Sequence, residues 1–436
     1  MRRSMKFLLT SLIFGLSELG GAHALATEFH VGTEEQLSRG GVVSPNFFPI
    51  LKMGFQGSSP HTEFDLELKF SAQHPKANAL VSKNLFYRFQ EAESSFQIAV
   101  GRKWINWSEG DELWNTGIIN PLDAWDRFRP KSQGLTGIFM SAENDSIRFD
   151  LFGSYLMIPE VMPNVVIENN QFQFFHPQSV SSGPQTFELL GKQTNIGYNV
   201  ALPSLNKLLI RPSILSSIES KNSISPIHVR LTAGYLPLNY FPVALQAGLI
   251  INNANIIVDL NPRILAHAVY SGDLSVKVTD EIKIGFTAIR DEIFQENSIP
   301  ADYTTATLGA TNYFTPWLKL GDLKASYLYS TGGLGPDEGP NANPNQNLFS
   351  SRILYRNAAQ ISYEIGEFNA QILHEFSINA DWIAMDWKKQ WNQNWSTVLG
   401  GDLISAEKLS ASDRGAEFLA DLRAVDRIRL GVNYVF

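Results

Sequence analysis

The sequence predicts a transmembrane antiparallel β-barrel, and three observations lead to this fold class. Residues 416–436 carry an apolar side chain at every second position except Asp426, while the intervening positions hold most of the charge. The N-terminal residues look like a secretory signal. No later stretch stays apolar for long enough to form a spanning helix. A chain with these properties crosses a membrane as strands, because backbone polar groups in lipid must be paired within the protein.

Residues 1–26 are expected to be the signal peptide. Two arginines and a lysine precede an apolar run at residues 7–16, and small residues stand before the expected cleavage point. The remaining residues 27–436 would form a single barrel domain. The alternative is an N-terminal membrane anchor, but the apolar run is shorter than the roughly 20 residues that a spanning helix needs.

Composition excludes some classes of partner. The formal net charge of −8 argues against a nucleic-acid partner, since such proteins present basic surfaces. The chain has no cysteine, so it has no disulfide or thiolate chemistry. We find no spacing typical of a metal or cofactor site, and none is predicted.

Alternation along the chain predicts about 18 strands, within a range of 16 to 20, and single-chain bacterial barrels have even strand numbers. We interpret residues 416–436 as one long strand because the alternation does not change phase there. Residues 205–220 could instead form a short helix, although Pro212 disfavours one. The candidate strands are residues 28–38, 51–55, 64–72, 85–90, 96–100, 135–141, 147–157, 187–202, 207–215, 227–236, 242–251, 263–278, 282–290, 304–314, 323–330, 352–365, 368–387, 395–405 and 416–436.

Short and long connections roughly alternate between these candidates. The short ones (91–94, 143–145, 279–281 and 366–367) are expected to be periplasmic turns, and the long ones around residues 110, 170, 296 and 340 extracellular loops. A soluble β-sandwich is the rival fold, because its strands also have one apolar face. The signal peptide, the terminal Phe436 and the charged polar faces favour the barrel.

The end of the chain carries the first of two resemblances to known protein families. Leu430, Val432, Tyr434 and Phe436 alternate up to the last residue. This ending resembles the C-terminal assembly signal of bacterial outer-membrane barrels. The resemblance implies a multi-pass barrel in the outer membrane of a Gram-negative bacterium, in contact with lipid and inserted by the barrel-assembly machinery through its last strand. The sequence does not fix an oligomeric state.

The second resemblance lies in an irregular stretch that is rich in tryptophan and charge. A strand ends in Gly-Arg, a tryptophan follows closely, and Asn-Pro-x-Asp comes later. The matching positions are Gly101, Arg102, Trp107, Asn120, Pro121 and Asp123. This pattern resembles a signature in a family of large Gram-negative outer-membrane barrels of unknown function. Ser108 stands where that family has a glycine, so the turn after Trp107 is expected to differ.

We predict that residues 102–133 fold into the lumen as a constriction or partial plug. Asp111 and other acids would face basic residues of the same loop and create a transverse field that selects solutes. The expected basic set is Arg102, Lys103, Arg127 and Arg129, and the expected acidic set is Glu109, Asp111, Glu112, Asp123 and Asp126. Asn120 and Pro121 would fix a turn, and Asp123 would accept backbone N–H groups.

Two other interpretations of this loop remain open. It could lie on the surface with its tryptophans in the interfacial girdle. Its acids at 109–112 could also bind Ca²⁺, although their spacing matches no standard loop.

The predicted function is a channel for passive or selective passage of small solutes. The alternatives are a non-conducting structural or adhesive barrel and a barrel-embedded hydrolase. The histidines form no nucleophile-elbow or His-x-x-x-His pattern, so no catalytic residue and no enzyme is predicted. Alternation places charges of both signs in the lumen, so no ion preference is predicted. These charges are Glu63, Asp65, Glu67, Lys69, Arg148, Asp150, Arg423, Arg427 and Arg429.

Overall fold

The structure is a computed structural model. The residues that it describes are 23–37, 46–71, 78–90, 94–161, 165–168, 171–174, 186–189, 192–200, 204, 206, 209–221, 226–239, 243–250, 255–262, 265–294, 310–332, 355–406, 419 and 426–435. The signal peptide predicted at residues 1–26 lies almost wholly outside this set and stays a prediction.

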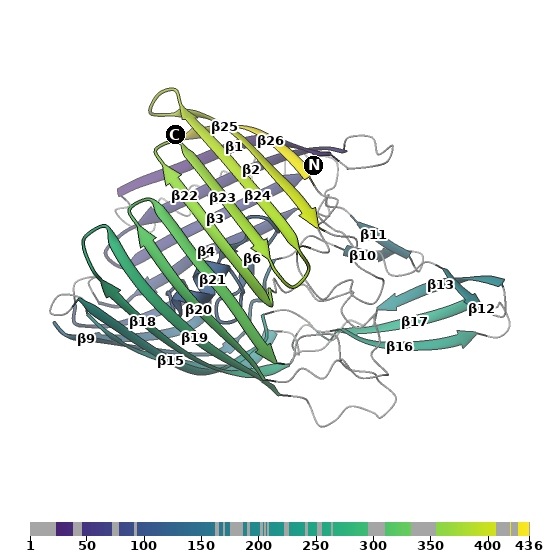
Figure 1. Ribbon diagram of the computed structural model, residues 1–436. Coiled ribbons are helices and arrows are strands. Elements are labelled where there is room, and N and C mark those ends of the chain that lie inside the picture. The colour runs from purple at the N-terminus through teal and green to yellow at the C-terminus, as the bar shows by residue number, and fades with distance from the viewer. Residues whose placement is uncertain are drawn as a thin grey trace, which may run out of the picture.

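Eighteen strands form one large antiparallel sheet (Figure 1). They are β1 (His23–Leu37), β2 (Asn46–Ser58), β3 (Thr62–Ser71), β4 (Ala79–Arg88), β5 (Phe96–Lys103), β8 (Leu135–Glu143), β9 (Ile147–Leu156), β14 (Ile210–Ser220), β15 (Ile227–Pro237), β18 (Ala266–Lys277), β19 (Ile282–Phe294), β20 (Thr311–Leu320), β21 (Leu323–Gly332), β22 (Asn357–Ile365), β23 (Phe368–Glu375), β24 (Ala380–Gln390), β25 (Trp395–Ala406) and β26 (Asp426–Val435). The predicted strand number is confirmed.

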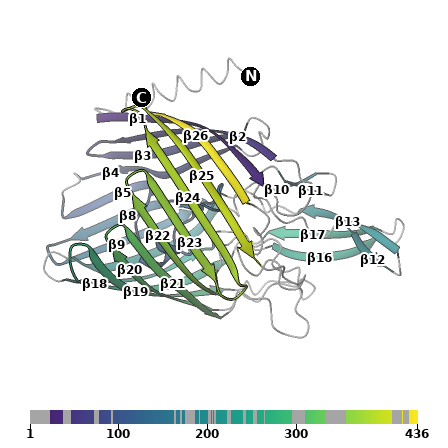
Figure 2. The same ribbon diagram turned by 45° about the horizontal axis from the view of Figure 1, so that its top comes forward.

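The sheet closes on itself and forms a barrel. Each of these strands pairs with the next one along the chain, and β26 also pairs with β1, from Glu28 opposite Val435 to Leu37 opposite Asp426. Figure 2 shows β1 and β26 side by side at the top of the barrel. Closure removes both sheet edges, so the backbone groups of all eighteen strands face a neighbouring strand.

Short and long connections lie at opposite ends of the barrel, because successive strands run antiparallel. The four connections predicted to be short join β4 to β5, β8 to β9, β18 to β19 and β22 to β23, all at one end. The four predicted to be long join β5 to β8, β9 to β14, β19 to β20 and β21 to β22, all at the other end. This confirms the predicted alternation.

Two of the candidate strands lie outside the barrel, which corrects the sequence prediction. Residues 187–202 fall on β12 (Thr186–Leu189) and β13 (Lys192–Val200), and residues 242–251 fall on β16 (Val243–Ile250). With β17 (Asn255–Pro262) these strands form a separate four-stranded sheet, which projects to the right of the barrel in Figure 1 beside the hairpin β10–β11 (Val165–Glu168, Gln171–Phe174). Period-two alternation identifies a strand but not the sheet that it joins.

Three predicted boundaries were also wrong. Residues 368–387 form two strands, β23 and β24, joined by a turn in which Asn379 takes a left-handed φ of 47°. Neither glycine nor proline marks that turn, so the alternation hid it. Residues 304–314 overlap β20 only from Thr311 onwards. The last strand begins at Asp426, and Leu419 is helical; the other residues of 416–425 lie outside the described set.

The outer face of the barrel is apolar. On β26, Ile428, Leu430 and Val432 are 49%, 55% and 41% exposed, whereas Arg427 is buried on the inner face. Exposed apolar side chains also follow the outer face of β4, β5, β8, β9, β14, β15 and β18–β25. Such a surface is stable only in lipid, so the barrel spans a membrane.

The last strand has the orientation that the sequence predicts. Leu430 and Val432 face outward, and the Tyr434 ring packs on Trp395 with ring centroids 4.6 Å apart. Phe436 lies outside the described residues. Among the residues that the structure describes, no helix has the length and apolar character required to cross a membrane.

The two faces of β25 give a direct test of this assignment. Leu399 is 45% exposed on the outer face, while its neighbour Val398 lines an inner cavity with Lys52 and Arg429. Leu399→Glu should lower the free energy of unfolding in lipid vesicles by roughly 1–3 kcal/mol, because it places a carboxylate in hydrocarbon. The control Val398→Glu should have a clearly smaller effect. Equal losses would show that the outer face does not meet lipid.

Candidate functional site: the segment 104–134 inside the barrel

Residues 104–134 connect two strands that are neighbours in the barrel wall. The segment leaves β5 after Lys103 and returns at Leu135 of β8, which is directly opposite Lys103 in the strand register. At its start, Gly101 has a φ of 132° and its Cα faces the backbone of β4 so closely that a Cβ would overlap the carbonyl oxygen of Leu85. Only glycine fits this position, which gives Gly101 a structural role. Arg102 follows it and is 9% exposed.

A short helix, α2 (Glu109–Trp114), lies in the first half of the segment. It ends at Asn115, whose φ of 46° is left-handed. The carboxylate of Asp111 then accepts hydrogen bonds from the backbone N–H groups of Ile118 and Ile119, both at 3.0 Å, and from the hydroxyl of Thr116. These three hydrogen bonds fix the turn after the helix, and Asp111 is only 4% exposed.

Asn120 ties the beginning of the segment to its middle. Its amide nitrogen donates to the carbonyl oxygen of Ile105 and to Oε1 of Glu112, both at 2.9 Å. Glu112 also accepts a hydrogen bond from the Ser132 hydroxyl at 2.8 Å. The carbonyl of Pro121 accepts the backbone N–H of Gln133 at 2.8 Å. These bonds cross-link the segment into a compact unit.

Wall residues on one side of the barrel bind the first half of the segment. The Thr232 hydroxyl of β15 donates to the carbonyl of Trp107 at 2.7 Å, and Asp273 of β18 accepts the backbone N–H of Glu109 at 3.1 Å. Further along the wall, the Gln360 amide of β22 donates to the carbonyl of Leu113 at 2.9 Å.

Asp123 anchors the segment to another part of the wall. Its carboxylate forms an ion pair with Nζ of Lys69 on β3, and both side chains are almost fully buried. Asp123 also accepts the backbone N–H of Trp125 at 3.3 Å, as the sequence predicted. The Lys69 Nζ lies 5.5 Å from the centroid of the Trp125 ring. Lys69 is thus shared by a carboxylate and an aromatic face.

Three arginines and three aspartates connect the second half of the segment to β24, β25 and β26. Arg129 binds Asp386 at 2.9 Å and Asp402 at 2.7 Å. Arg427 binds Asp126 of the segment at 2.8 Å and also contacts Asp402. Arg429 completes the cluster through Asp386. The charges balance, and charge-assisted bonds of this kind are strong when several groups share them.

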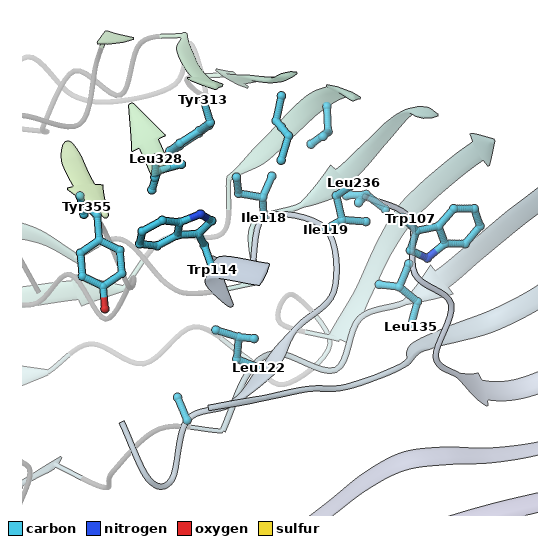
Figure 3. Packing of buried hydrophobic residues seen from close by; sticks show 14 of the residues in the cluster. Trp107, Trp114, Ile118, Ile119, Leu122, Leu135, Leu236, Tyr313, Leu328 and Tyr355 are labelled. Atoms are coloured by element: carbon cyan, nitrogen blue, oxygen red, sulfur yellow. The ribbon is translucent and has the colours of Figure 1, made fainter. Parts of the chain in front are cut away.

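Apolar side chains fill the space between these polar anchors. Trp107 is fully buried, and Trp114 meets Tyr355 at a centroid distance of 5.5 Å. Figure 3 shows Trp114 between Tyr355 and Ile118, with Ile119 further along the segment and Trp107 beside Leu236. Because its partners come from β3, β15, β18, β22 and β24–β26, the segment lies inside the barrel and reaches across it.

The charge pairing differs from the sequence prediction. We expected the basic and acidic residues of the segment to face one another, but Asp123, Asp126 and Arg129 form their ion pairs with wall residues. Burying a charge is costly unless a partner is held at short range, and the wall strands supply that partner. Asp111 accepts hydrogen bonds from its own loop and, within the described residues, forms no ion pair with the wall.

Two cavities lie beside the segment, and Glu112 lines both. The first has a volume of about 330 Å³ and is bordered by Trp114, Arg127, Tyr355 and the wall of β21–β24. The second, of about 520 Å³, is bordered by β2, β3, β4, β25 and β26. Within the described residues no group of three or more histidine or acidic side chains could hold a metal ion.

The sequence did not single out the anchors Asp386 and Asp402. Asp386 lies on the same face of β24 as the buried Trp382, and Asp402 lies on the same face of β25 as the buried Ile404, so both aspartates face the lumen. An acid on the polar face of a strand is a common feature, and no further signal marks it. Lys69, Arg427 and Arg429 were predicted to face the lumen, and they do so, but their partners could not be assigned.

The geometry defines the class of protein as an 18-stranded transmembrane β-barrel with an inward-folded segment. No protein-family model and no curated protein matches the chain. Among solved structures, OccAB4 of Acinetobacter baumannii matches at 8% identity over 94% of this chain and 97% of that one, with a TM-score of 0.46. OpdQ of Pseudomonas aeruginosa matches at 10% identity over 95% of this chain and 97% of that one, with a TM-score of 0.44. The outer membrane protein OprD of the same organism matches at 8% identity over 94% of this chain and 92% of that one, with a TM-score of 0.43. The fold assignment rests on the strand pairing.

The ion pair between Lys69 and Asp123 should hold the segment in place. Asp123→Ala leaves the buried Lys69 without its carboxylate, which should lower the free energy of unfolding by about 3 kcal/mol and raise the conductance of the refolded barrel. Lys69→Met in the Asp123→Ala background is the control and should recover most of the stability. If Asp123→Ala changes neither stability nor conductance, the constriction hypothesis is wrong.

Packing of the segment should depend on pH through Glu112. Burial and the nearby Asp111 carboxylate raise the pKa of Glu112 from 4.5 to about 7. The folded pKa exceeds the unfolded one, so the packing is most stable below pH 4.5 and weakens as the pH rises through 7. Protease cleavage within the segment should therefore be faster at about pH 8 than at about pH 5, and Glu112→Gln should remove most of that difference. An unchanged pH profile in the variant would contradict this.

Proposed function

We propose that the chain is an outer-membrane channel through which small solutes cross, and that residues 104–134 form its constriction. The observation that carries the proposal is the pair of cavities on either side of the segment, about 330 and 520 Å³. Spaces of this size accommodate small organic solutes. A barrel of 18 strands is wide enough to enclose a water-filled lumen, which the segment narrows without filling.

The residues of the sequence motif divide into two roles under this proposal. Gly101, Trp107, Asn120 and Pro121 shape and pack the segment. Asp123 fastens it to the wall. The constriction itself would be formed by side chains that border the cavities, Glu112 among them. The resemblance to the outer-membrane family of unknown function rests on these residues together with Arg102, and it belongs to this proposal.

The location follows from the same features. The apolar outer face requires lipid, and the strand arrangement is that of barrels in the outer membrane of Gram-negative bacteria. Leu430 and Val432 present the last strand outward, in keeping with recognition by the barrel-assembly machinery. In an outer membrane, a barrel of this kind has its short turns at the periplasmic side and its long connections at the exterior.

A non-conducting barrel is the second candidate, because the anchors of the segment reach the wall on several sides. Arg129, Asp126 and Asp123 together hold it against β3 and β24–β26. A segment fastened at so many points could act as a plug. The two functions differ in whether the cavities join into a continuous aqueous path.

Single-channel recording of residues 27–436 in a planar bilayer tests the proposal. We expect steady conductance steps, with barrel formation verified by heat-modifiability on a gel. Replacing residues 106–132 with a short flexible linker should raise the conductance several-fold, since pore conductance grows with the open cross-section. The milder variant Arg129→Gln should give larger or noisier steps without removing the segment. A folded but silent wild-type barrel would favour the plug and contradict the channel.

A further inference from the structure

Four lysines stand in one row on neighbouring strands of the barrel wall. In the strand register, Lys277 of β18 is opposite Lys283 of β19, Lys283 is opposite Lys319 of β20, and Lys319 is opposite Lys324 of β21. Residues directly opposite in an antiparallel sheet have Cα atoms about 5 Å apart. The sequence spreads these lysines over 48 positions, from 277 to 324, so only the pairing reveals the row.

All four lysines occupy inward-facing positions near the end of the barrel that carries the short turns. On β18, β19 and β20 they share parity with the buried Ser275, Thr287 and Trp317. The adjacent positions Ile284 and Leu318 are exposed on the outer, lipid-facing side. Lys324 borders the first cavity. The row therefore runs along the wall of one mouth of the lumen and ends at that cavity.

Acidic residues stand close to the row in the two short turns: Asp280 and Glu281 follow β18, and Asp322 precedes β21. Asp280, in the turn after β18, binds Lys277 at 2.7 Å. Within the described part of the chain, Lys283, Lys319 and Lys324 form no ion pair, although Lys283 lies 5.3 Å from the centroid of the Trp317 ring. The next inward row is uncharged and consists of Ser275, Gly285, Trp317 and Ser326. Like charges directly opposite in a sheet are destabilising, so packing does not account for this arrangement.

The first cavity carries a surplus of basic side chains, whereas the second is close to balanced. The first has Arg127, Arg129 and Lys324 against Glu112. The second has a larger set of both signs: Lys52, Lys83, Lys131 and Arg429 against Asp65, Glu67 and Glu112. Arg129 and Arg429 are already paired with Asp386 and Asp402, and Lys131 is paired with Glu67. The net charge of the whole chain is −8, so the positive charge at the first cavity and the mouth is a local property of the lumen.

We propose that the lysine row and the first cavity form a path for anions through the lumen, which makes the channel selective for small anionic solutes. The inference rests on the proposed channel function and names its substrate class. Rows of one sign of charge in a narrow aqueous passage concentrate counter-ions and exclude co-ions, and the effect weakens as salt screens it. Lys324 joins the row at the short-turn mouth to the cavity that Arg127 also lines.

The reversal potential in a potassium chloride gradient across a planar bilayer tests the proposal. For the wild-type chain we expect a chloride-to-potassium permeability ratio above one, and the same preference with potassium acetate. The triple variant Lys283→Gln, Lys319→Gln, Lys324→Gln should lower the ratio at least about twofold, and more at low salt than at high salt. Each single replacement should lower it by a smaller step, which keeps the test decisive if the triple variant does not fold.

Lys221→Gln is the matched control. Lys221 also lies at the short-turn end, but it is paired with Glu143 at 3.3 Å, so its replacement should leave the ratio unchanged. A wild-type channel that conducts but prefers potassium, or a ratio that the triple variant does not alter, overturns the anion path and leaves the channel function standing. A barrel that does not conduct at all overturns the channel function itself, and the anion path with it.

Discussion

The hydrogen bonds between β26 and β1 are the interaction on which the rest of the structure depends. They join the last strand of the barrel to the first and leave no open edge in the eighteen-stranded sheet. In a bilayer an unpaired edge would expose a row of N–H and C=O groups to hydrocarbon, at a cost of several kcal/mol for each group. Closure also separates an inside from an outside. Outward side chains then contact lipid and must be apolar, whereas inward side chains do not contact lipid and can be polar.

The inward side chains use that freedom to hold residues 104–134. Lys69 fastens Asp123 to one part of the wall, while Arg427 and Asp402 fasten Asp126 and Arg129 to another. Each of these charges is buried, and a buried charge is tolerated only beside a partner. The second half of the segment is consequently fastened to the arc of wall that runs from β24 through β26 and β1 to β3. Cavities remain at its flanks, where the wall and the segment do not meet.

Much of this arrangement could be predicted from period-two patterns. Alternation placed Arg427 and Arg429 in the lumen and Leu430 in lipid, and the structure agrees. The same signal misassigned residues 187–202, which alternate well but belong to the small sheet outside the barrel. Alternation reports that a strand has two unlike faces. It does not report which strands are its neighbours.

For the same reason the cross-barrel contacts could not be predicted. The partners Arg427 and Asp126 are 301 positions apart in the sequence, and the lysine row becomes visible only when four strands are set in register. The tryptophan-rich motif did indicate an unusual loop. Its residues proved to shape and anchor the segment, whereas the side chains that border the cavities, such as Lys324 and Tyr355, lie on distant strands.

The central claim is that solutes pass the cavities beside the inward-folded segment. Because the chain has no cysteine, a single Ser362→Cys variant places one thiol at the wall of the first cavity. The most direct measurement is the current through single channels of this variant while a charged methanethiosulfonate reagent is added. The account predicts a stable stepwise change in current as the thiol reacts, with no change in the wild type. Complete labelling of the Ser362→Cys variant, verified by mass, with an unaltered current would contradict it.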